Sequence, residues 1–379
     1  MDDTRANRRG RYSGLPLMVF LGLYFGLSPI YLFDSGLPQL ADFVMVCFIF
    51  LAAISGIRID RGGYDLVIPG LVFVFYVFVV SVSWSIILSS YSTMMAPVFY
   101  LYNFLAMILV YSSYKKNSDL TLKAILYGIS AGLTVSVLYQ VLNFDAHASR
   151  QAALFNNPNQ MGYFGLLCAG ISLLIFENGR VSHKYFAYNF ILSLLLVFLS
   201  FSLTAIAGLF FIVLASVVVL YRKGAKTIVI APFVFVFSVS FLAVAFDDKL
   251  YYVSESVERR ISLIETKTEN VGDSRGYSRI LDYPEYLIFG AAEGERSRFG
   301  LYHRHEIHSS LGTVLFSYGV VGFFIFCAFL FSAIRRSDVV GFLIFLGPMV
   351  YSLTHQGLRN TIFWIFILLI YLLKGSLKK

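Results

Sequence analysis

The chain of 379 residues is 58% hydrophobic and 17% aromatic, and only 14% of its residues are charged. A soluble domain carries roughly 25% charged residues, so this composition excludes an ordinary water-soluble protein and predicts an all-α polytopic membrane protein. The net charge of +8 gives no reason to expect a nucleic-acid partner, because the basic residues lie mostly between apolar runs, where they orient membrane helices.

Apolar runs follow one another along the chain, and most approach the length of about 20 residues that crosses a hydrocarbon core of roughly 30 Å. The boundary near residues 200–204 is the least distinct, because Ser200 to Ala205 provides only a tight turn. The runs predict about twelve transmembrane helices, at residues 15–33, 37–57, 66–89, 93–113, 120–142, 159–177, 185–202, 204–221, 227–246, 307–333, 338–354 and 360–374.

Basic residues mark every second connection between these runs. Short loops rich in lysine and arginine stay in the cytoplasm, so the pattern predicts a multi-pass protein with both termini cytoplasmic. The short connections on the opposite side hold only two basic residues, Arg150 and Arg359. The basic connections contain Arg58 and Arg61, Lys115, Lys116 and Lys123, Arg180 and Lys184, Arg222, Lys223 and Lys226, and Arg335 and Arg336.

One long hydrophilic stretch, residues 247–306, interrupts the apolar pattern between the ninth and tenth predicted helices. The charge pattern places it on the external, periplasmic side. We interpret residues 1–379 as a single membrane domain and 247–306 as its external loop subdomain, which carries much of the candidate site. Glycine and proline divide the later part of this loop into turns, at Gly272, Gly276, Pro284, Gly290, Gly294 and Gly300.

The external arginines are candidates for binding a polyanion, because a guanidinium group binds phosphate through two parallel hydrogen bonds and stays charged. Arg275 and Arg279 are four residues apart, and on a helix they would share one face. Arg150 and Arg359 are the isolated external arginines described above. The alternative for all four is a solvated or snorkelling side chain.

His308 is the candidate general base, since it begins an apolar run at the external interface and histidine is the usual base for a hydroxyl nucleophile. Clustered histidines can instead bind zinc, and His303 and His305 are close in sequence. An ordinary interfacial histidine is the third alternative. No HExxH motif or nearby thiolate accompanies the cluster, so the sequence favours chemistry without a metal or other cofactor.

Two further residues have supporting roles in this interpretation. Asn159 could cap the sixth predicted helix after Pro158, and the free N–H groups of that helix start could bind an anion. Glu306 could orient His308 or His305, although two residues that are two positions apart on a helix do not face each other.

The segment from His308 to Gly322 resembles the signature of the O-antigen ligase and Wzy polymerase superfamily, in which His-Asn precedes a hydrophobic helix ending in Gly-aliphatic-aliphatic-Gly. Here that ending is Gly319-Val-Val-Gly322. Two positions depart from the pattern: Ser309 replaces the asparagine, and the stretch from Ser202 to Thr204 lacks the arginine of the family's Ser-Arg pair. Upstream resemblances are Ser274-Arg275, Tyr283-Pro284, Gly290 and Gly294, and Phe155 to Gly162 with its Asn-Pro-Asn sequence.

The resemblance implies an enzyme of the bacterial inner membrane that transfers a glycan from undecaprenyl diphosphate to an acceptor hydroxyl. The reaction would be inverting and independent of metals, with His308 as base and the arginines on the donor diphosphate. The expected partners are the lipid-linked glycan donor, the glycan acceptor, membrane lipids and a chain-length regulator protein.

Three functions fit this chemistry or its location. A polymerase would join lipid-linked repeat units into O-antigen, capsule or exopolysaccharide, and we favour it. An O-antigen ligase would transfer the glycan to lipid A–core. A transporter or flippase for lipid-linked oligosaccharides belongs to another class, and transporters commonly contain internal repeats and ionisable residues at the membrane centre, which the sequence does not show.

Overall fold

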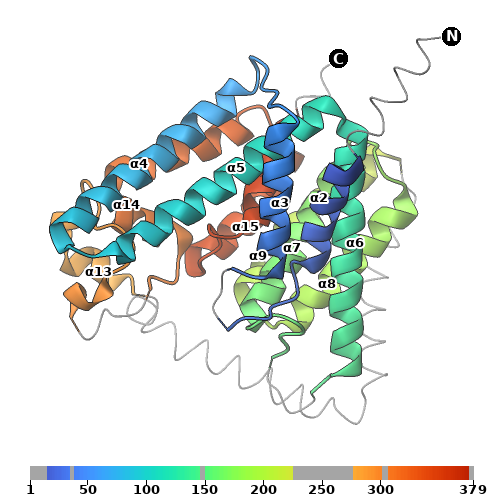
Figure 1. Cartoon of the computed structure of the whole chain (residues 1–379). Helices are drawn as coiled ribbons and strands as arrows, with labels where there is room; N and C mark the ends of the chain where they lie inside the picture. Colours follow the sequence, from blue (N-terminus) through green and yellow to red (C-terminus); the bar gives the residue numbers. More distant parts are fainter. Residues whose placement is uncertain (1–14, 35–37, 146–149, 225–275, 301–305, 375–379) are drawn as a thin grey trace.

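The computed structural model describes residues 15–34, 38–145, 150–224, 276–300 and 306–374 of the chain (Figure 1). Within these residues all regular structure is helical. The long helices are α2 (Leu15–Leu27), α3 (Leu40–Ile54), α4 (Tyr64–Leu88), α5 (Met95–Lys116), α6 (Ser118–Leu142), α7 (Pro158–Glu177), α8 (His183–Leu199), α9 (Leu203–Arg222), α14 (Ser310–Ile334), α15 (Val339–Thr354) and α16 (Thr361–Lys374).

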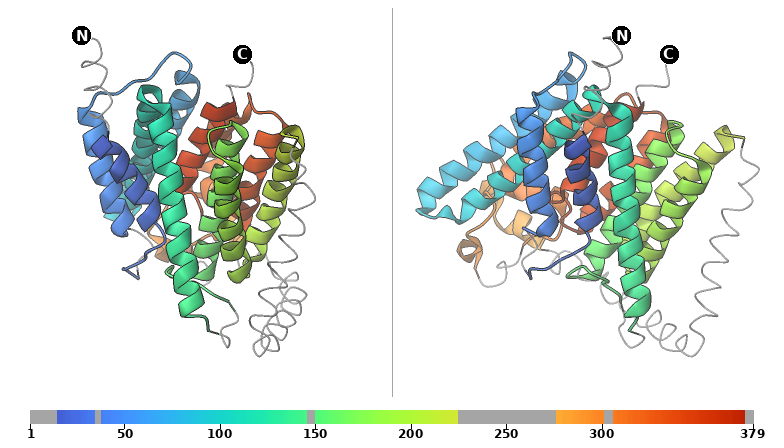
Figure 2. Two further views of the ribbon diagram at one scale, coloured as in Figure 1. Left: turned by 90° about the vertical axis from the view of Figure 1, so that its right-hand side faces the viewer. Right: turned by 45° about the vertical axis from the view of Figure 1, so that its right-hand side comes forward.

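Six of the described helical segments are long and apolar enough to cross a membrane, and five shorter apolar helices accompany them. Figure 2 shows the helices side by side, with their connections gathered at two ends of the bundle. The predicted helices thus occur wherever the chain is described. The predicted run 227–246 lies outside the described residues, as does most of the loop 247–306. The turn predicted near 200–204 is confirmed, because α8 ends at Leu199 and α9 begins at Leu203.

The centre of the bundle is formed by α7 and α16. Nearly every residue of α7 is buried, and residues 362–370 of α16 are at most 1% exposed. A helix that is apolar on all sides fits such a central position. The outer helices instead expose large apolar side chains, for example Phe75 and Phe78 on α4, as expected for surfaces that face lipid rather than water.

One end of the bundle gathers the basic residues that alternate along the sequence, and we call it the basic end. There Arg222 pairs with Glu177 at 3.5 Å and also with Asp338. Arg336 pairs with Asp65 at 2.7 Å. Helix α2 begins and helix α16 ends at this same end (Figure 1). The grouping of the basic connections predicted from the sequence therefore holds in the fold.

The opposite end, which we call the site end, includes residues 276–300. They form the short helices α13 (Ser278–Asp282), η3 (Pro284–Tyr286) and η4 (Arg296–Phe299). The predicted turns are confirmed where the chain is described: Gly276, Gly290, Gly294 and Gly300 all have positive φ, a conformation that glycine adopts without steric cost.

Helix α14 is interrupted at Gly319, where φ is 66° and ψ is −176°. The backbone of residues 287–292 lies against this break. Val320 N–H donates to the Leu287 carbonyl at 2.7 Å, and Ala292 N–H donates to the Ser317 carbonyl at 2.8 Å. The backbone groups released by the break are thus satisfied by residues 287–292, and this contact fixes the position of the residues that follow them.

Candidate functional site

A cavity of about 510 Å³ opens at the site end, between the ends of α2, α3, α7, α15 and α16. We call it the histidine cavity, because His308 and His355 both line it. Its wall carries side-chain amides and aromatic rings in large number: Gln39, Asn157, Asn159, Gln160, Gln356 and Asn360, together with Tyr24, Tyr31, Phe99, Phe155, Tyr163, Phe164 and Tyr351. Amides both donate and accept hydrogen bonds, so this wall suits a ligand rich in hydroxyl groups.

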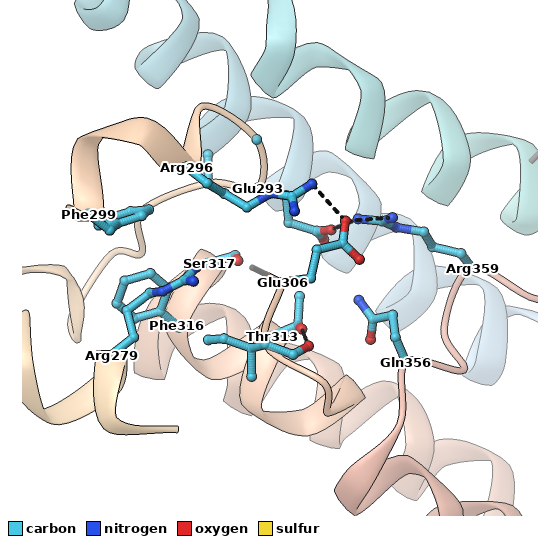
Figure 3. Close-up of a pocket in the computed structure, with 13 residues that line it drawn as sticks. Arg279, Glu293, Arg296, Phe299, Glu306, Thr313, Phe316, Ser317, Gln356 and Arg359 are labelled. Carbon is cyan, nitrogen blue, oxygen red and sulfur yellow. Dashed lines mark hydrogen bonds and ion pairs between the residues drawn. The ribbon is translucent and has the colours of Figure 1, made fainter. Parts of the chain in front are cut away.

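A group of four charged side chains lies beside the cavity, and we call it the ion-pair centre: Glu293, Arg296, Glu306 and Arg359. Arg359 pairs with Glu293, and it also reaches Glu306 at 3.3 Å. Arg296 pairs with the same Glu306 oxygen at 3.0 Å. Figure 3 shows Glu293, Arg296 and Glu306 converging on Arg359, which lies in the connection before α16. Arg359 is therefore held by two carboxylates rather than solvated.

Glu293 is the most buried member of this centre, with 8% of its surface exposed. Its second carboxylate oxygen accepts hydrogen bonds from the hydroxyl groups of Tyr100 and Tyr318, each at 3.0 Å. Buried carboxylates need such partners, because a charge without them costs several kcal/mol. Glu293 therefore ties α5, α14 and Arg359 together.

The opposite charges in the ion-pair centre favour the charged forms of Glu306 and Arg359. Burial by itself raises the pKa of Glu306, but the positive charges of Arg359 and Arg296 outweigh it, so this pKa lies below the ordinary glutamate value. Burial lowers the pKa of Arg359, but Glu293 and Glu306 raise it by more. Both groups therefore stay charged around neutral pH.

Glu306 and His308 both line the histidine cavity. The helical spacing that would keep their side chains apart does not apply here, because α14 begins only at Ser310. The positive charge of His308 contributes to lowering the pKa of Glu306.

Ser309 is the position at which the sequence departs from the His-Asn signature that this segment resembles. It is the N-cap of α14, and its hydroxyl accepts a hydrogen bond from Gly312 N–H at 3.0 Å. Serine and asparagine are among the best N-cap residues. The departure therefore keeps the start of the helix, directly after His308, capped.

The cap of α7 is Asn157 and not Asn159, contrary to the sequence-based expectation. The Asn157 side chain accepts from Gln160 N–H at 3.0 Å, and Pro158 occupies the first helical position, where a missing N–H costs nothing. Asn159 has other partners. Its side-chain oxygen accepts from Arg150 Nη2 at 2.5 Å, and its carbonyl accepts from the Tyr351 hydroxyl at 3.0 Å.

Arg150 also donates from Nε to the Ser200 carbonyl at 2.9 Å, so it connects the start of α7 to the turn between α8 and α9. It is not among the residues that line the histidine cavity, whereas Asn159 and Arg359 are. Arg150 therefore contacts the cavity residue Asn159 but does not itself line the cavity.

Arg279 is 4% exposed, and its guanidinium lies 5.0 Å from the Phe299 ring centre and 5.7 Å from that of Phe316. Burial, together with the neighbouring charge of Arg296, lowers the pKa of Arg279 to about 10. Arg279 and Arg359 line one small pocket (Figure 3). Of the four predicted arginines, Arg359 thus belongs to the ion-pair centre and Arg279 lies next to it.

Arg275, His303 and His305 lie outside the described residues, so their predicted roles are not tested. The expected helical pairing of Arg275 with Arg279 is wrong in one respect. Gly276 has φ +73° and α13 begins only at Ser278, so no helix extends from one arginine to the other. The zinc alternative for the histidine cluster also stays open, because His303 and His305 lie outside the described residues.

His355 is a cavity residue that the sequence interpretation missed. Its Nδ1 lies 3.0 Å from the Thr204 hydroxyl and 2.9 Å from that of Thr354. Its ring stacks on Tyr351 at 4.7 Å between centres, and its carbonyl accepts from Ser310 N–H at 3.1 Å. His355 thus joins the end of α15 to the start of α9 at Thr204.

Glu293, Arg296 and Gln356 were also missed. One signal was visible in the sequence: residues 355–360 read His-Gln-Gly-Leu-Arg-Asn, which is a polar group within an otherwise apolar stretch. Glu293 had no such signal beyond its place between Gly290 and Gly294.

A second cavity, of about 690 Å³, is lined by all four members of the ion-pair centre. We call it the serine cavity, because Ser92 and Ser297 line it. Three residues line both cavities: Phe99, Glu306 and Arg359. The two spaces therefore meet at the ion-pair centre.

Neither a scan against models of known protein families nor a search of curated proteins finds a match to this chain.

Proposed function

We propose that this protein is an integral-membrane glycosyltransferase that polymerises undecaprenyl-diphosphate-linked repeat units at the outer face of the bacterial cytoplasmic membrane. In this proposal the chain crosses the membrane about twelve times, each crossing needing about 20 residues. The basic end faces the cytoplasm, as the positive-inside rule favours, and the site end faces the periplasm.

One observation carries the proposal: His308 lines one amide- and tyrosine-rich cavity at the site end together with Glu306 and Arg359 of the ion-pair centre. A histidine suits proton removal from a sugar hydroxyl. The amides and tyrosine hydroxyls suit recognition of the other hydroxyls, and the aromatic rings suit the apolar faces of sugar rings. The cavity volume of about 510 Å³ falls in the range typical of small-ligand sites.

The proposed reaction is a direct displacement at the anomeric carbon of the donor sugar. His308 takes the proton of the acceptor hydroxyl, whose oxygen forms the new bond to that carbon. The bond from the carbon to the diphosphate oxygen breaks, and the lipid diphosphate leaves with the electron pair. One displacement inverts the configuration at the carbon, as in inverting glycoside chemistry. Preorganised positive groups would stabilise the leaving charge, and Arg279 and Arg275 are the proposed contacts.

The acceptor distinguishes this proposal from a ligase, which would use the same donor chemistry. Glycan analysis of a deletion strain separates the two. Single repeat units on lipid A–core would support the polymerase. Long chains remaining on undecaprenyl diphosphate would support a ligase instead, and repeat units retained on the cytoplasmic face would support a flippase. An unchanged glycan profile would contradict all three.

A further inference from the structure

The histidine cavity contains two histidines, and the proposed reaction uses only one of them. His308 and His355 both line this space of about 510 Å³, so a substrate that reaches His308 also comes near His355. His355 is half-buried and lies in the connection between α15 and α16. Its chain neighbour Gln356 lines both this cavity and the small pocket of Arg279. His355 therefore lies close to the side chains proposed to contact the donor.

The two histidines occupy opposite kinds of helix end. His355 is the C-cap of α15, and the partial negative charge at the end of a helix favours a protonated histidine. His308 directly precedes Ser309, the N-cap of α14, where partial positive charge favours the neutral imidazole. When the environments of two titratable groups in one site differ in this way, their acid–base roles separate. A neutral histidine suits a base, and a charged histidine suits contact with an anion.

The contacts of the His355 ring permit the charged form. Its Nδ1 lies 3.0 Å from the hydroxyl oxygen of Thr204 and 2.9 Å from that of Thr354. A hydroxyl group can accept a hydrogen bond from a protonated Nδ1 or donate one to an unprotonated Nδ1, so a change of charge breaks neither contact. The ring also stacks on Tyr351. The side chain is therefore oriented before a ligand enters, which reduces the entropy lost on binding.

The cavity wall needs an additional positive charge if it is to accept a diphosphate. Its formally charged side chains are two carboxylates and one guanidinium group, on Asp42, Glu306 and Arg359, with a formal sum of −1. The tyrosines of the wall stay neutral near pH 7: Tyr24, Tyr31, Tyr163 and Tyr351. A diphosphate would meet net repulsion from these groups alone. Protonation of His355 would offset this charge and leave His308 available as the base.

Glu306 is the group that acts against this division of roles, because its negative charge and the positive charge of His308 favour each other. Arg359 pairs with Glu306 at 3.3 Å, and Arg296 pairs with it at 3.0 Å. These two guanidinium groups offset the effect of the carboxylate on His308.

We propose that His355 binds the diphosphate of the lipid-linked donor and carries a proton in that complex, while His308 stays neutral and accepts the proton of the acceptor hydroxyl. The negative charge of the bound diphosphate favours the protonated form of His355 further. This inference rests on the proposed glycosyltransferase function. It adds to that function a donor contact from the connection between α15 and α16.

The test replaces His355 by side chains of similar size that cannot become charged. His355→Asn keeps an amide close to the position of Nδ1, and His355→Gln is a second variant. Binding of undecaprenyl diphosphate to purified protein is measured from pH 6 to pH 9, and transfer is measured with lipid-linked repeat units extracted from bacterial membranes. Comparison with wild type at each pH cancels titration of the ligand itself. His183→Ala is the matched control, because His183 is an exposed histidine at the basic end.

His355→Asn should raise the Kd for undecaprenyl diphosphate about tenfold at pH 6, since one charge-assisted hydrogen bond is lost. Protonation is favoured more in the complex than in the free protein, so the advantage of wild type is present below the ordinary histidine pKa of roughly 6.5. It is lost as the pH rises through the higher value in the complex. The ratio of the two Kd values should therefore approach one by about pH 9. His183→Ala should bind like wild type, and His308→Ala should keep the wild-type pH dependence.

A Kd ratio that is the same at every pH would overturn the inference, because it would make His355 a packing residue. Unchanged binding with lost transfer would overturn it as well, because His355 would then be the base. Equally strong competition by phosphatidylglycerol would show a site for lipid phosphates in general and not for the donor.

If neither variant folds, modification of wild-type histidines by diethyl pyrocarbonate decides. Undecaprenyl diphosphate should protect His355 and not His183, as located by mass spectrometry, and equal modification of His355 with and without the lipid would contradict the inference. A wild-type protein that neither binds undecaprenyl diphosphate nor transfers glycan would contradict the proposed function itself, which separates that failure from failure of the His355 contact.

Discussion

Gly290 and Gly319 lie backbone against backbone where residues 287–292 meet the break in α14. A Cβ atom on Gly319 would lie 2.2 Å from the Ile288 carbonyl oxygen, and one on Gly290 would lie 2.3 Å from the Ser317 carbonyl oxygen. Real Cβ atoms do not approach backbone this closely, so only glycine fits at either position. This contact sets the path of the backbone just before Glu293, and so places the Glu293 side chain next to Arg359.

Gly319→Ala should therefore prevent stable folding. The substitution combines the backbone clash with a φ of 66°, which a residue with a Cβ adopts only at a cost. We expect destabilisation above roughly 4 kcal/mol, seen as loss of monodisperse protein in detergent. Gly62→Ala is the control, because the nearest atom to its Cβ would be an Asp60 oxygen at 3.8 Å. Normal accumulation of Gly319→Ala would show that the break can be closed.

Glu293→Gln should uncouple Arg359 from the centre. Removing one partner of a buried ion pair leaves the other charge uncompensated, which costs roughly 3 kcal/mol or more. Thermal unfolding in detergent should reveal this loss. The double variant with Arg359→Gln should lose less than the sum of the two single variants, because the interaction has already been removed. Strict additivity would mean that the two side chains do not depend on each other.

The acid stability of the centre follows from the direction of the Glu306 pKa. The folded-state pKa lies below the unfolded value of roughly 4.3, so the stabilisation is present above that value and is lost as the pH falls through the lower, folded value. The difference in unfolding temperature between wild type and Glu306→Gln should therefore be present at about pH 5 and shrink below about pH 4. A difference that grows on acidification would contradict this sign.

Arg279 should be needed for donor binding even when its charge is retained. Lysine lacks the planar group that lies over Phe299 and Phe316 and cannot bind phosphate through two parallel bonds. Arg279→Lys should therefore weaken binding of undecaprenyl diphosphate about tenfold, as expected when a charge-assisted bond of roughly 1.5–3 kcal/mol is lost. Arg279→Ala should be at least as impaired. Lys123→Ala is the control, because Lys123 is an exposed residue at the basic end. If Arg279→Lys, Arg279→Ala and Lys123→Ala all bind undecaprenyl diphosphate equally well, Arg279 serves packing and not donor binding.

The sequence predicted what depends on local pattern. Helix positions follow from apolar runs, and the turns at Gly290 and Gly294 follow from the conformational freedom of glycine. The cap of α7 was misplaced by two residues, because Asn157 and Asn159 are equally good caps by type and only the backbone at Pro158 decides between them.

The ion-pair centre could not be predicted in this way, because its partners are far apart in sequence. Glu293 is 193 positions from Tyr100 and 66 from Arg359. The same holds for His355, whose neighbour Thr204 lies 151 positions earlier. These groups come together only when α5, α9, α14 and the connection before α16 pack against one another. A single sequence contains no local pattern that predicts such long-range contacts.

The central claim is that His308 accepts the proton of an acceptor hydroxyl, and transfer by purified protein with lipid-linked repeat units tests it most directly. His308→Ala should lower the transfer rate by about 10²–10⁴-fold, the usual contribution of a positioned base, while folding and binding of undecaprenyl diphosphate are retained. His183→Ala, an exposed histidine at the basic end, should transfer at the wild-type rate. Wild-type transfer by His308→Ala would contradict the account.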